Sequence, residues 1–227
     1  MNRKRMLVGG ALLAFLALAA SGLFLWERRT PPQKIAPVHQ APRLELHVPH
    51  AGGSIVLDGD VDDPGWRKNT ARTKGFVNAD GLPARPYSDA RLAWADGHLY
   101  LALYAADEDI RTTDSFHLEL SAGNWRRTID VTPLGVLTDG QRVNGTELPW
   151  KSGAHVSHEL DGTPDDDQGD DEEWVLEMAI PFESVELEGK RGEEIGFSVH
   201  RCDKPKLSAP SCGSWGEGEP HGVLILD

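Results

Sequence analysis

The sequence has little positive charge outside its N-terminus. Five of its 23 basic side chains, but only one of its 36 acidic ones, fall within the first thirty residues. The rest of the chain therefore carries 18 basic against 35 acidic side chains, a net charge of about −17. A surface this acidic repels phosphate backbones, so nucleic acid is excluded as a partner.

Cysteine is also scarce. The sequence contains only Cys202 and Cys212, close together in a stretch that includes two prolines. In an exported chain such a pair predicts a disulfide, and closing so short a loop contributes roughly 2 to 3 kcal/mol. A metal or redox pair is the alternative, but neither the spacing nor an adjacent third ligand supports it.

Recognisable catalytic motifs are missing as well. The chain has no nucleophile elbow, no His-Glu-x-x-His zinc motif and no phosphate-binding loop. His155 and His158 are too isolated to define a metal site. Acidic residues are abundant, so paired carboxylates for glycoside hydrolysis stay open as an alternative. We expect a domain without catalytic activity of its own and with no required cofactor.

One long hydrophobic run is present, at residues 6–26, behind the basic cluster Arg3-Lys4-Arg5. This arrangement is typical of an export signal. Ala17-Leu18-Ala19 resembles a cleavage site, whereas the length of the run, roughly 20 residues, suits an apolar helix that spans a bilayer. Residues 1–29 are therefore a signal peptide or a signal anchor.

The basic cluster predicts an inward N-terminus and an exported remainder. We expect a domain anchored in the inner membrane and facing the periplasm or exterior, or a secreted domain if the signal is cleaved. Prolines at irregular spacing make residues 30–49 a linker, although Leu44, Leu46 and Val48 alternate as in an edge strand. The folded domain is assigned to residues 50–227.

Residues 91–120 show the fold class most clearly. Apolar residues alternate on both sides of Asp96-Gly97, a dipeptide that favours a two-residue turn, which predicts a β-hairpin. A third run alternates from Ser115 to Leu120, and similar runs cover residues 125–131, 174–180 and 195–201. No segment of the domain has helical periodicity. The prediction is an all-β fold, a jelly-roll-like antiparallel β-sandwich.

Strand alternation also predicts a polar face. With Phe116 and Leu118 inward, His117 and Glu119 point outward. The same argument places Asp130 and His200 outward on their strands. If the three strands are neighbours, these four polar side chains form one face that could receive a ligand, and an ordinary solvated sheet face is the alternative.

Aspartates gather in several loops. Asp107, Asp109 and Asp114 are candidate ligands for a structural calcium ion, because carboxylate oxygens suit that cation. Residues 58–63 hold four aspartates, but turn chemistry explains this loop more simply than calcium does. The acidic run at residues 164–173 is typical of a solvated segment.

Seven segments together resemble family 9 carbohydrate-binding modules and the wider group of DOMON-like sandwiches. These segments are I-V-L-D-G-D-V-D-D-P-G-W, H-L-Y-L-A-L-Y-A-A-D, D-S-F-H-L-E-L, D-V-T-P-L-G, W-V-L-E-M-A-I-P-F, G-F-S-V-H-R and S-W-G-E-G-E-P-H-G-V-L. The resemblance implies an exported sandwich that binds a polysaccharide or glycan, is often attached to glycoside hydrolases, sometimes holds structural calcium and performs no catalysis.

Two positions depart from the pattern of the family. Where a stacking tryptophan typically precedes the D-S strand, this chain has Arg111, which is itself a candidate ligand-binding residue, and residues 217–221 contain no aromatic. Trp125 and Trp150 lie outside the matched segments and are the remaining candidates for stacking, although Trp125 shares the parity of the core. The alternatives are a cell-envelope scaffold that has lost the sugar site, or a haem-binding DOMON domain with Met178 as an axial ligand.

Overall fold

The computed structural model describes residues 43–166, 170–218 and 221–227. The predicted signal peptide or apolar N-terminal helix and most of the predicted linker lie outside these residues. Within the described ranges, no helix combines the length and the apolar character that crossing a bilayer requires. The membrane anchor therefore stays a prediction from the sequence.

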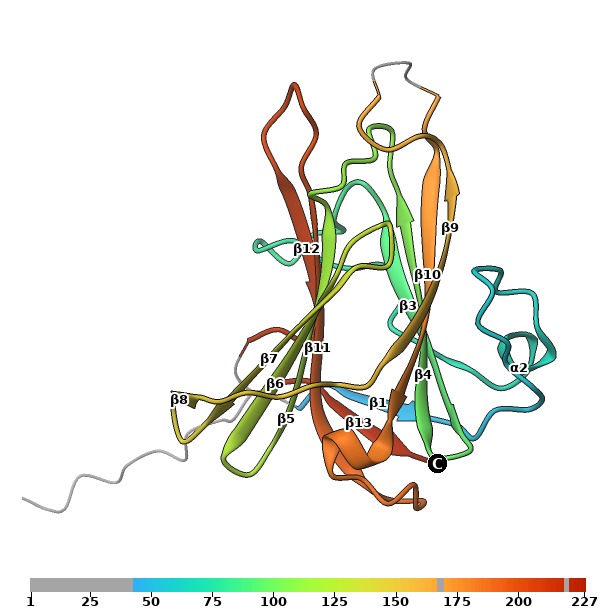
Figure 1. The fold of residues 1–227 in the computed structure, drawn as a ribbon, viewed down its shortest axis with the longest axis vertical. Helices are drawn as coiled ribbons and strands as arrows, with labels where there is room; N and C mark the ends of the chain where they lie inside the picture. The colour runs from blue at the N-terminus through green and yellow to red at the C-terminus, as the bar shows by residue number, and fades with distance from the viewer. Residues whose placement is uncertain (1–42, 167–169, 219–220) are drawn as a thin grey trace, which may run out of the picture. The chain divides into compact units, whose positions relative to one another are not determined.

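The domain consists of two facing β-sheets (Figure 1). The strands of the larger sheet, in spatial order, are β1 (Glu45–Val48), β13 (Val223–Leu226), β11 (Glu194–Asp203), β5 (Ser115–Ala122), β6 (Trp125–Val131), β7 (Leu137–Val143) and β8 (Thr146–Glu147), with β12 (Ser211–Trp215) also paired to β11. Those of the smaller sheet are β2 (Ala71–Arg72), β3 (Ser88–Ala95), β4 (His98–Ala106), β10 (Glu173–Pro181) and β9 (His155–Asp161). Helical turns are confined to α2 (Pro64–Arg67) and the 3-10 turn η1 (Phe182–Val185) among the described residues. The predicted all-β sandwich is confirmed.

The central hairpin forms as its sequence predicts. β3 and β4 pair in antiparallel register, and Asp96 and Gly97 both have positive φ, at 47° and 78°. The following strand behaves differently, because β5 leaves this sheet and joins the opposite one. The stretch from residue 91 to residue 120 thus supplies strands to both layers and connects them.

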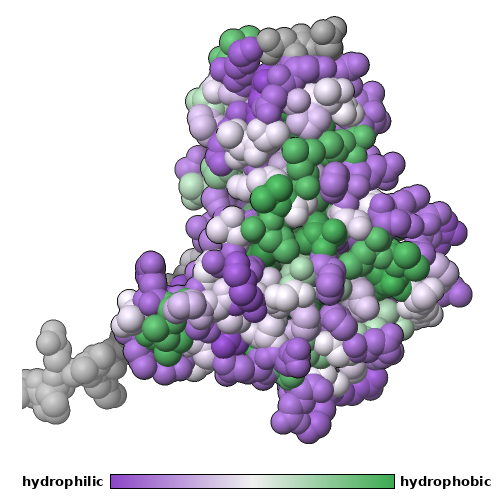
Figure 2. Space-filling view, in the orientation of Figure 1, coloured by the Kyte–Doolittle hydropathy of each residue, from purple (hydrophilic) through white to green (hydrophobic). Residues whose placement is uncertain are grey.

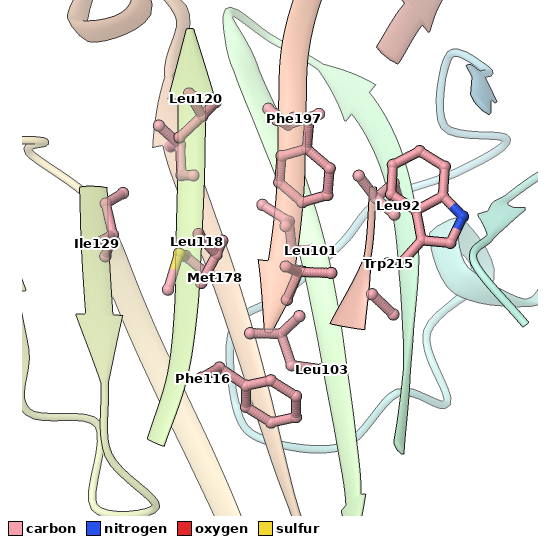
Figure 3. Packing of buried hydrophobic residues seen from close by; sticks show 14 of the residues in the cluster. Leu92, Leu101, Leu103, Phe116, Leu118, Leu120, Ile129, Met178, Phe197 and Trp215 are labelled. Carbon is pink, nitrogen blue, oxygen red and sulfur yellow. The ribbon is translucent and has the colours of Figure 1, made fainter. Parts of the chain in front are cut away.

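Alternate residues of the two sheets meet in one apolar core. Figure 3 shows Leu101 and Leu103 of β4 packed against Phe116 and Leu118 of β5 and Phe197 of β11, and all five side chains are fully buried. Burying a side chain of this size contributes roughly 1.5 to 3 kcal/mol. Met178 belongs to the same core and is fully buried, as expected of an ordinary core residue rather than a haem ligand.

The edges of the sheets differ from the prediction in two ways. β1 pairs with β13 in parallel, so the larger sheet is not antiparallel throughout, and β1 lies within the range assigned to the linker. Strands also occur where the sequence shows no strand pattern, because β7 ends within residues 140–173 and β8 and β9 lie within that range. These strands lack an alternating apolar pattern because most of their side chains are only half-buried or exposed.

The predicted disulfide is present between Cys202 and Cys212. The two residues are direct register partners across β11 and β12, so the bond closes the hairpin that these strands form. His200 lies next to the bond, with Nε2 3.4 Å from Cys202 Sγ. Both sulfurs are used in the bond, which leaves no thiolate to bind a metal.

The surface is mostly hydrophilic. In the view of Figure 2, polar residues dominate and an apolar area lies near the middle. Among the described residues, large apolar side chains that remain exposed include Val136, Leu82 and Leu207. More than half of the accessible surface of a typical folded protein comes from apolar atoms, so this exposure identifies no site by itself.

Candidate functional site

The polar-face prediction assumes that three strands are neighbours, and in the structure β11, β5 and β6 are neighbours. In the order β11, β5, β6, His200 is the register partner of His117, and His117 is the partner of Asp130. His117 Nδ1 lies 2.8 Å from Asp130 Oδ1. Glu119, two residues after His117 on β5, faces the same side. The structure therefore brings the four predicted polar residues onto one outer face, which we call the polar row.

The pKa values of the two histidines of the polar row are shifted in opposite directions. The hydrogen bond that His117 donates to Asp130, together with the negative charge of Asp130, raises the pKa of His117. Burial lowers the pKa of His200. Near neutral pH, His117 thus retains a proton more readily, while His200 stays neutral and offers one donor and one acceptor. The polar row can therefore donate hydrogen bonds at one position and accept them at the next.

Further polar groups, not singled out from the sequence, extend this face. Glu119 Oε1 accepts a hydrogen bond from Arg126 Nη1 at 2.7 Å and lies 3.5 Å from His221 Nε2. Ser198 and Thr128 are the register partners of Glu119 on either side. Arg126 and Thr128 alternate in step with Asp130 along β6, so the sequence contains a signal that places both on this face. His221 lies in a loop, where no such alternation exists.

Trp125 and Trp150 are not on this face. Both lie around the guanidinium of Arg127, whose Cζ is 4.1 Å from the centre of the Trp125 ring and 5.5 Å from that of Trp150. Arg127 also donates to Glu186 Oε1 at 2.7 Å, and Trp125 Nε1 donates to Glu186 Oε2 at 3.0 Å. Trp125 is 7% exposed, so its ring is used in this cluster rather than offered to a ligand.

Arg111 lies in yet another place. Its guanidinium forms an ion pair with Asp109, and its backbone N–H donates to Asp114 Oδ2 at 2.8 Å. It lines a pocket of about 1120 Å³ between the loops that follow β4 and β11. The structure therefore separates Arg111 from the polar row.

Three buried carboxylates meet at this end of the sandwich. Ligand atoms of Asp107, Asp114 and Asp203 lie within 4.8 Å of one another. Asp109, the third candidate calcium ligand, is outside the group, and Asp203 takes its place. Arg201 Nη2 donates to Asp107 Oδ2 at 2.8 Å and to Asp203 Oδ1 at 3.4 Å. We call these four residues the acidic cluster.

The carboxylate oxygens of the acidic cluster fit calcium poorly. Asp107 Oδ2 accepts hydrogen bonds from Arg201 and from Trp174 Nε1, and Asp107 Oδ1 accepts one from the backbone of Asp109. Both oxygens of Asp114 accept backbone N–H groups. These carboxylate oxygens already accept hydrogen bonds, and the guanidinium of Arg201 provides the positive charge. The chemistry is therefore that of a buried ion pair rather than a calcium site.

The acidic cluster predicts a pH-dependent stability. Burial raises the pKa of Asp203, and that of Asp114, to about 6. A raised carboxyl pKa means that the folded state holds the proton more tightly, so the contribution to stability is complete below about pH 4 and is lost as pH rises through about 6. Asp203→Asn should remove this loss. The free energy of unfolding of the variant minus that of the wild type should therefore be about 1 to 3 kcal/mol higher at pH 8 than at pH 4.

Urea denaturation of the wild type and the variant at several pH values measures this effect. Asp80→Asn is a matched control, because that residue is exposed and lies outside the acidic cluster. A difference between wild type and Asp203→Asn that is the same at pH 4 and pH 8 would contradict the prediction.

Comparison with solved structures identifies the fold. A family 9 carbohydrate-binding module from Caldicellulosiruptor kristjanssonii, in complex with cellotriose, superposes with a TM-score of 0.59 at 16% identity over 81% of this chain and 93% of its own. The same kind of module in complex with glucose gives a TM-score of 0.57 at 15% identity over 80% and 95%. A protein from Bacteroides uniformis with a proposed carbohydrate-binding role gives 0.62 at 16% identity over 82% and 100%.

These similarities show that the domain has a family 9-like fold. At the level of sequence, no family model matches the chain, and no curated protein matches it. The predicted resemblance in fold is confirmed, while the ligand has to be argued from the residues of the site.

Proposed function

We propose that the domain is an exported, non-catalytic carbohydrate-binding module and that the polar row receives the glycan. The observation that carries the proposal is the alignment of His200, His117 and Asp130 across three paired strands, with Glu119 beside them. A rigid sheet holds these groups at fixed spacing. Such an array can hydrogen-bond several hydroxyls of one sugar without ordering a loop.

The recognition would depend on hydrogen bonds rather than on stacking. Trp125 and Trp150 surround Arg127, and Arg111 replaces the aromatic expected before β5. Without an aromatic platform, each sugar contact is a polar one, and such contacts are modest in net free energy because they replace contacts with water. We therefore expect an affinity in the micromolar to millimolar range and a need for several contacts on one glycan.

Substitution of the two histidines tests the proposal. His117→Ala and His200→Ala should each weaken binding of the preferred oligosaccharide on a glycan array about 5- to 10-fold, because each removes a hydrogen bond worth roughly 1 kcal/mol. Isothermal titration calorimetry measures the change. His158→Ala is the matched control, since His158 is an exposed histidine on β9 of the other sheet.

The scaffold alternative makes the opposite prediction. A domain that has lost the sugar site would bind no plant, bacterial or host glycan on the array, and neither histidine substitution would have a measurable effect. If His158→Ala weakens binding as much as His117→Ala and His200→Ala do, this result would also contradict the assignment of the ligand to the polar row.

A further inference from the structure

A histidine lies beside the disulfide of the β11–β12 hairpin. His200 comes two residues before Cys202 on β11, and residues two apart on a strand share a face. Its Nε2 is 3.4 Å from Cys202 Sγ. The ligand atoms of His200, Cys202 and Cys212 all lie within 4.8 Å of one another. The structure thus supplies the adjacent third ligand that the sequence analysis did not identify.

Two thiolates and an imidazole form a donor set that suits zinc. In tetrahedral sites the Zn–S bond is about 2.3 Å and the Zn–N bond about 2.0 to 2.1 Å. These lengths place a sulfur and a nitrogen ligand about 3.6 Å apart, and two sulfur ligands about 3.8 Å apart. The distance of 3.4 Å from His200 Nε2 to Cys202 Sγ is close to the first value. The second value requires the disulfide to be reduced, because the bond joins the two sulfurs directly.

The backbone holds the two cysteines together independently of the disulfide. Cys202 and Cys212 are one of five register pairs between β11 and β12. β11 pairs with β5 as well. Val77 and Ser214 of β12 exchange two backbone hydrogen bonds, at 3.0 and 2.8 Å. After reduction, these contacts should keep both thiols next to the imidazole, so that rotation of the side chains is sufficient to surround a metal ion.

A dithiol donor can reduce this bond, because neither cysteine is buried. One thiolate of the donor bonds to Cys212 Sγ, and the S–S bond breaks with Cys202 leaving as a thiolate beside His200. The second thiol of the donor then displaces Cys212 from the mixed disulfide. Two electrons and two protons pass from the donor to the cysteines, and the donor becomes a disulfide. Each cysteine thiol gives up its proton when a metal binds.

We propose that the reduced β11–β12 hairpin is a zinc site with Cys202, Cys212 and His200 as protein ligands and water as the fourth ligand. The oxidised hairpin lacks the thiolates, so its oxidation state decides whether zinc binds. The proposal goes beyond glycan binding and does not depend on it. The two activities meet at His200, since this residue also belongs to the polar row.

Metal titration of the full chain tests the proposal. The protein is reduced with dithiothreitol, desalted without oxygen and titrated with Zn²⁺ in a calorimeter. We expect the reduced chain to bind zinc and, when Co²⁺ replaces Zn²⁺, to show a thiolate-to-cobalt charge-transfer absorption. The oxidised chain should show no such absorption. Equal zinc affinity of the oxidised and reduced chains, or reduction without the absorption, would overturn the proposal.

Substitutions identify the ligands. His200→Ala should weaken zinc binding by the reduced chain at least about 10-fold, because it removes one of three protein ligands. His158→Ala, which changes an exposed histidine on β9, is the matched control and should leave the affinity unchanged. The double variant Cys202→Ser, Cys212→Ser should lose the cobalt absorption, and it provides the test if His200→Ala does not fold.

The histidine pair also distinguishes a built site from an unfolded chain. A reduced chain that had lost its fold could bind metal through both cysteines and any histidine, so His200→Ala and His158→Ala would then have equal effects. That result would overturn the proposal. A selective loss in His200→Ala supports it. Glycan binding takes no part in these measurements, so a failure of the proposed function would leave their outcome unchanged.

Discussion

Arg201→Met should lower the free energy of unfolding by about 3 to 5 kcal/mol, because it removes one partner from a buried ion pair. Arg201 is 3% exposed and donates to Asp107 Oδ2, to Asp203 Oδ1 and to Ser88 Oγ at 3.2 Å. Without the guanidinium, the carboxylate of Asp107 would remain buried, at 1% exposed, with no positive charge beside it. Urea denaturation followed by tryptophan fluorescence measures the loss.

An exposed arginine provides the control for this prediction. Arg67 forms an ion pair with Asp62 at 2.8 Å, and both side chains are about two-thirds exposed. Because surface pairs contribute about 1 kcal/mol or less, Arg67→Met should have a small effect. A second test joins Arg201→Met to Asp203→Asn, which removes one of the stranded carboxylates and should restore part of the lost stability. Equal losses from Arg201→Met and Arg67→Met would contradict the role assigned to Arg201.

Glu177→Leu is expected to cost a similar amount, about 3 to 5 kcal/mol, for a different reason. Glu177 on β10 is fully buried, and its carboxylate accepts three hydrogen bonds. Oε2 accepts the backbone N–H groups of Asp58 and Gly59 at 3.0 and 2.8 Å, and Oε1 accepts Trp66 Nε1 at 2.6 Å. Leucine would leave three donors without an acceptor, two of them buried and one partly buried.

Two variants make this prediction specific. Trp66→Phe removes one of the three hydrogen bonds and retains most of the apolar ring, so the expected loss is about 1 to 2 kcal/mol. Glu159→Leu on β9 changes an exposed glutamate and should alter stability by less than about 0.5 kcal/mol. Chemical denaturation of all three variants ranks them. If Glu177→Leu is no more destabilising than Glu159→Leu, the carboxylate does not hold the segment from Asp58 to Trp66.

The hydrogen bonds of Glu177 also explain one of the sequence segments that resembles family 9. The run from Ile55 to Trp66 reads as an acidic turn, and turn chemistry was the simpler interpretation of its aspartates. The structure supports that interpretation, since Asp58 Oδ1 accepts the backbone N–H of Asp60 and Asp63 Oδ2 accepts that of Val56. The anchor of the segment lies 111 residues beyond Trp66, and no local pattern could reveal it.

Alternation was sufficient to predict those strands that bury one face. Leu99, Leu101 and Leu103 are fully buried, whereas Tyr100 and Tyr104 on the alternate positions are half-buried. The same parity placed His117 and Glu119 outward, where they are found. β7 and β9 could not be predicted in this way, because they lie toward the sheet edges and bury no continuous apolar side.

The parts of the site that were missed depend on contacts between distant segments. Trp150 was a candidate for stacking because it lies outside the segments that resemble family 9, yet Arg127 from β6 lies over its ring. Likewise, Asp203 joins Asp107 and Asp114 only because β11 runs beside β5. Spacing within a loop suggested Asp109 instead. Which carboxylates meet is decided by sheet pairing, which composition and local pattern do not specify.

The parallel pairing of β1 with β13 has a mechanical consequence. The four register pairs of the two strands lie side by side along the edge of the sheet, and the chain before β1 enters beside the first residue of β13. A force drawn through that entering chain along the strand axis would load all of these pairs together in shear, instead of opening them one at a time from an end. Such an edge resists extraction better than a hairpin whose pairs open one after another.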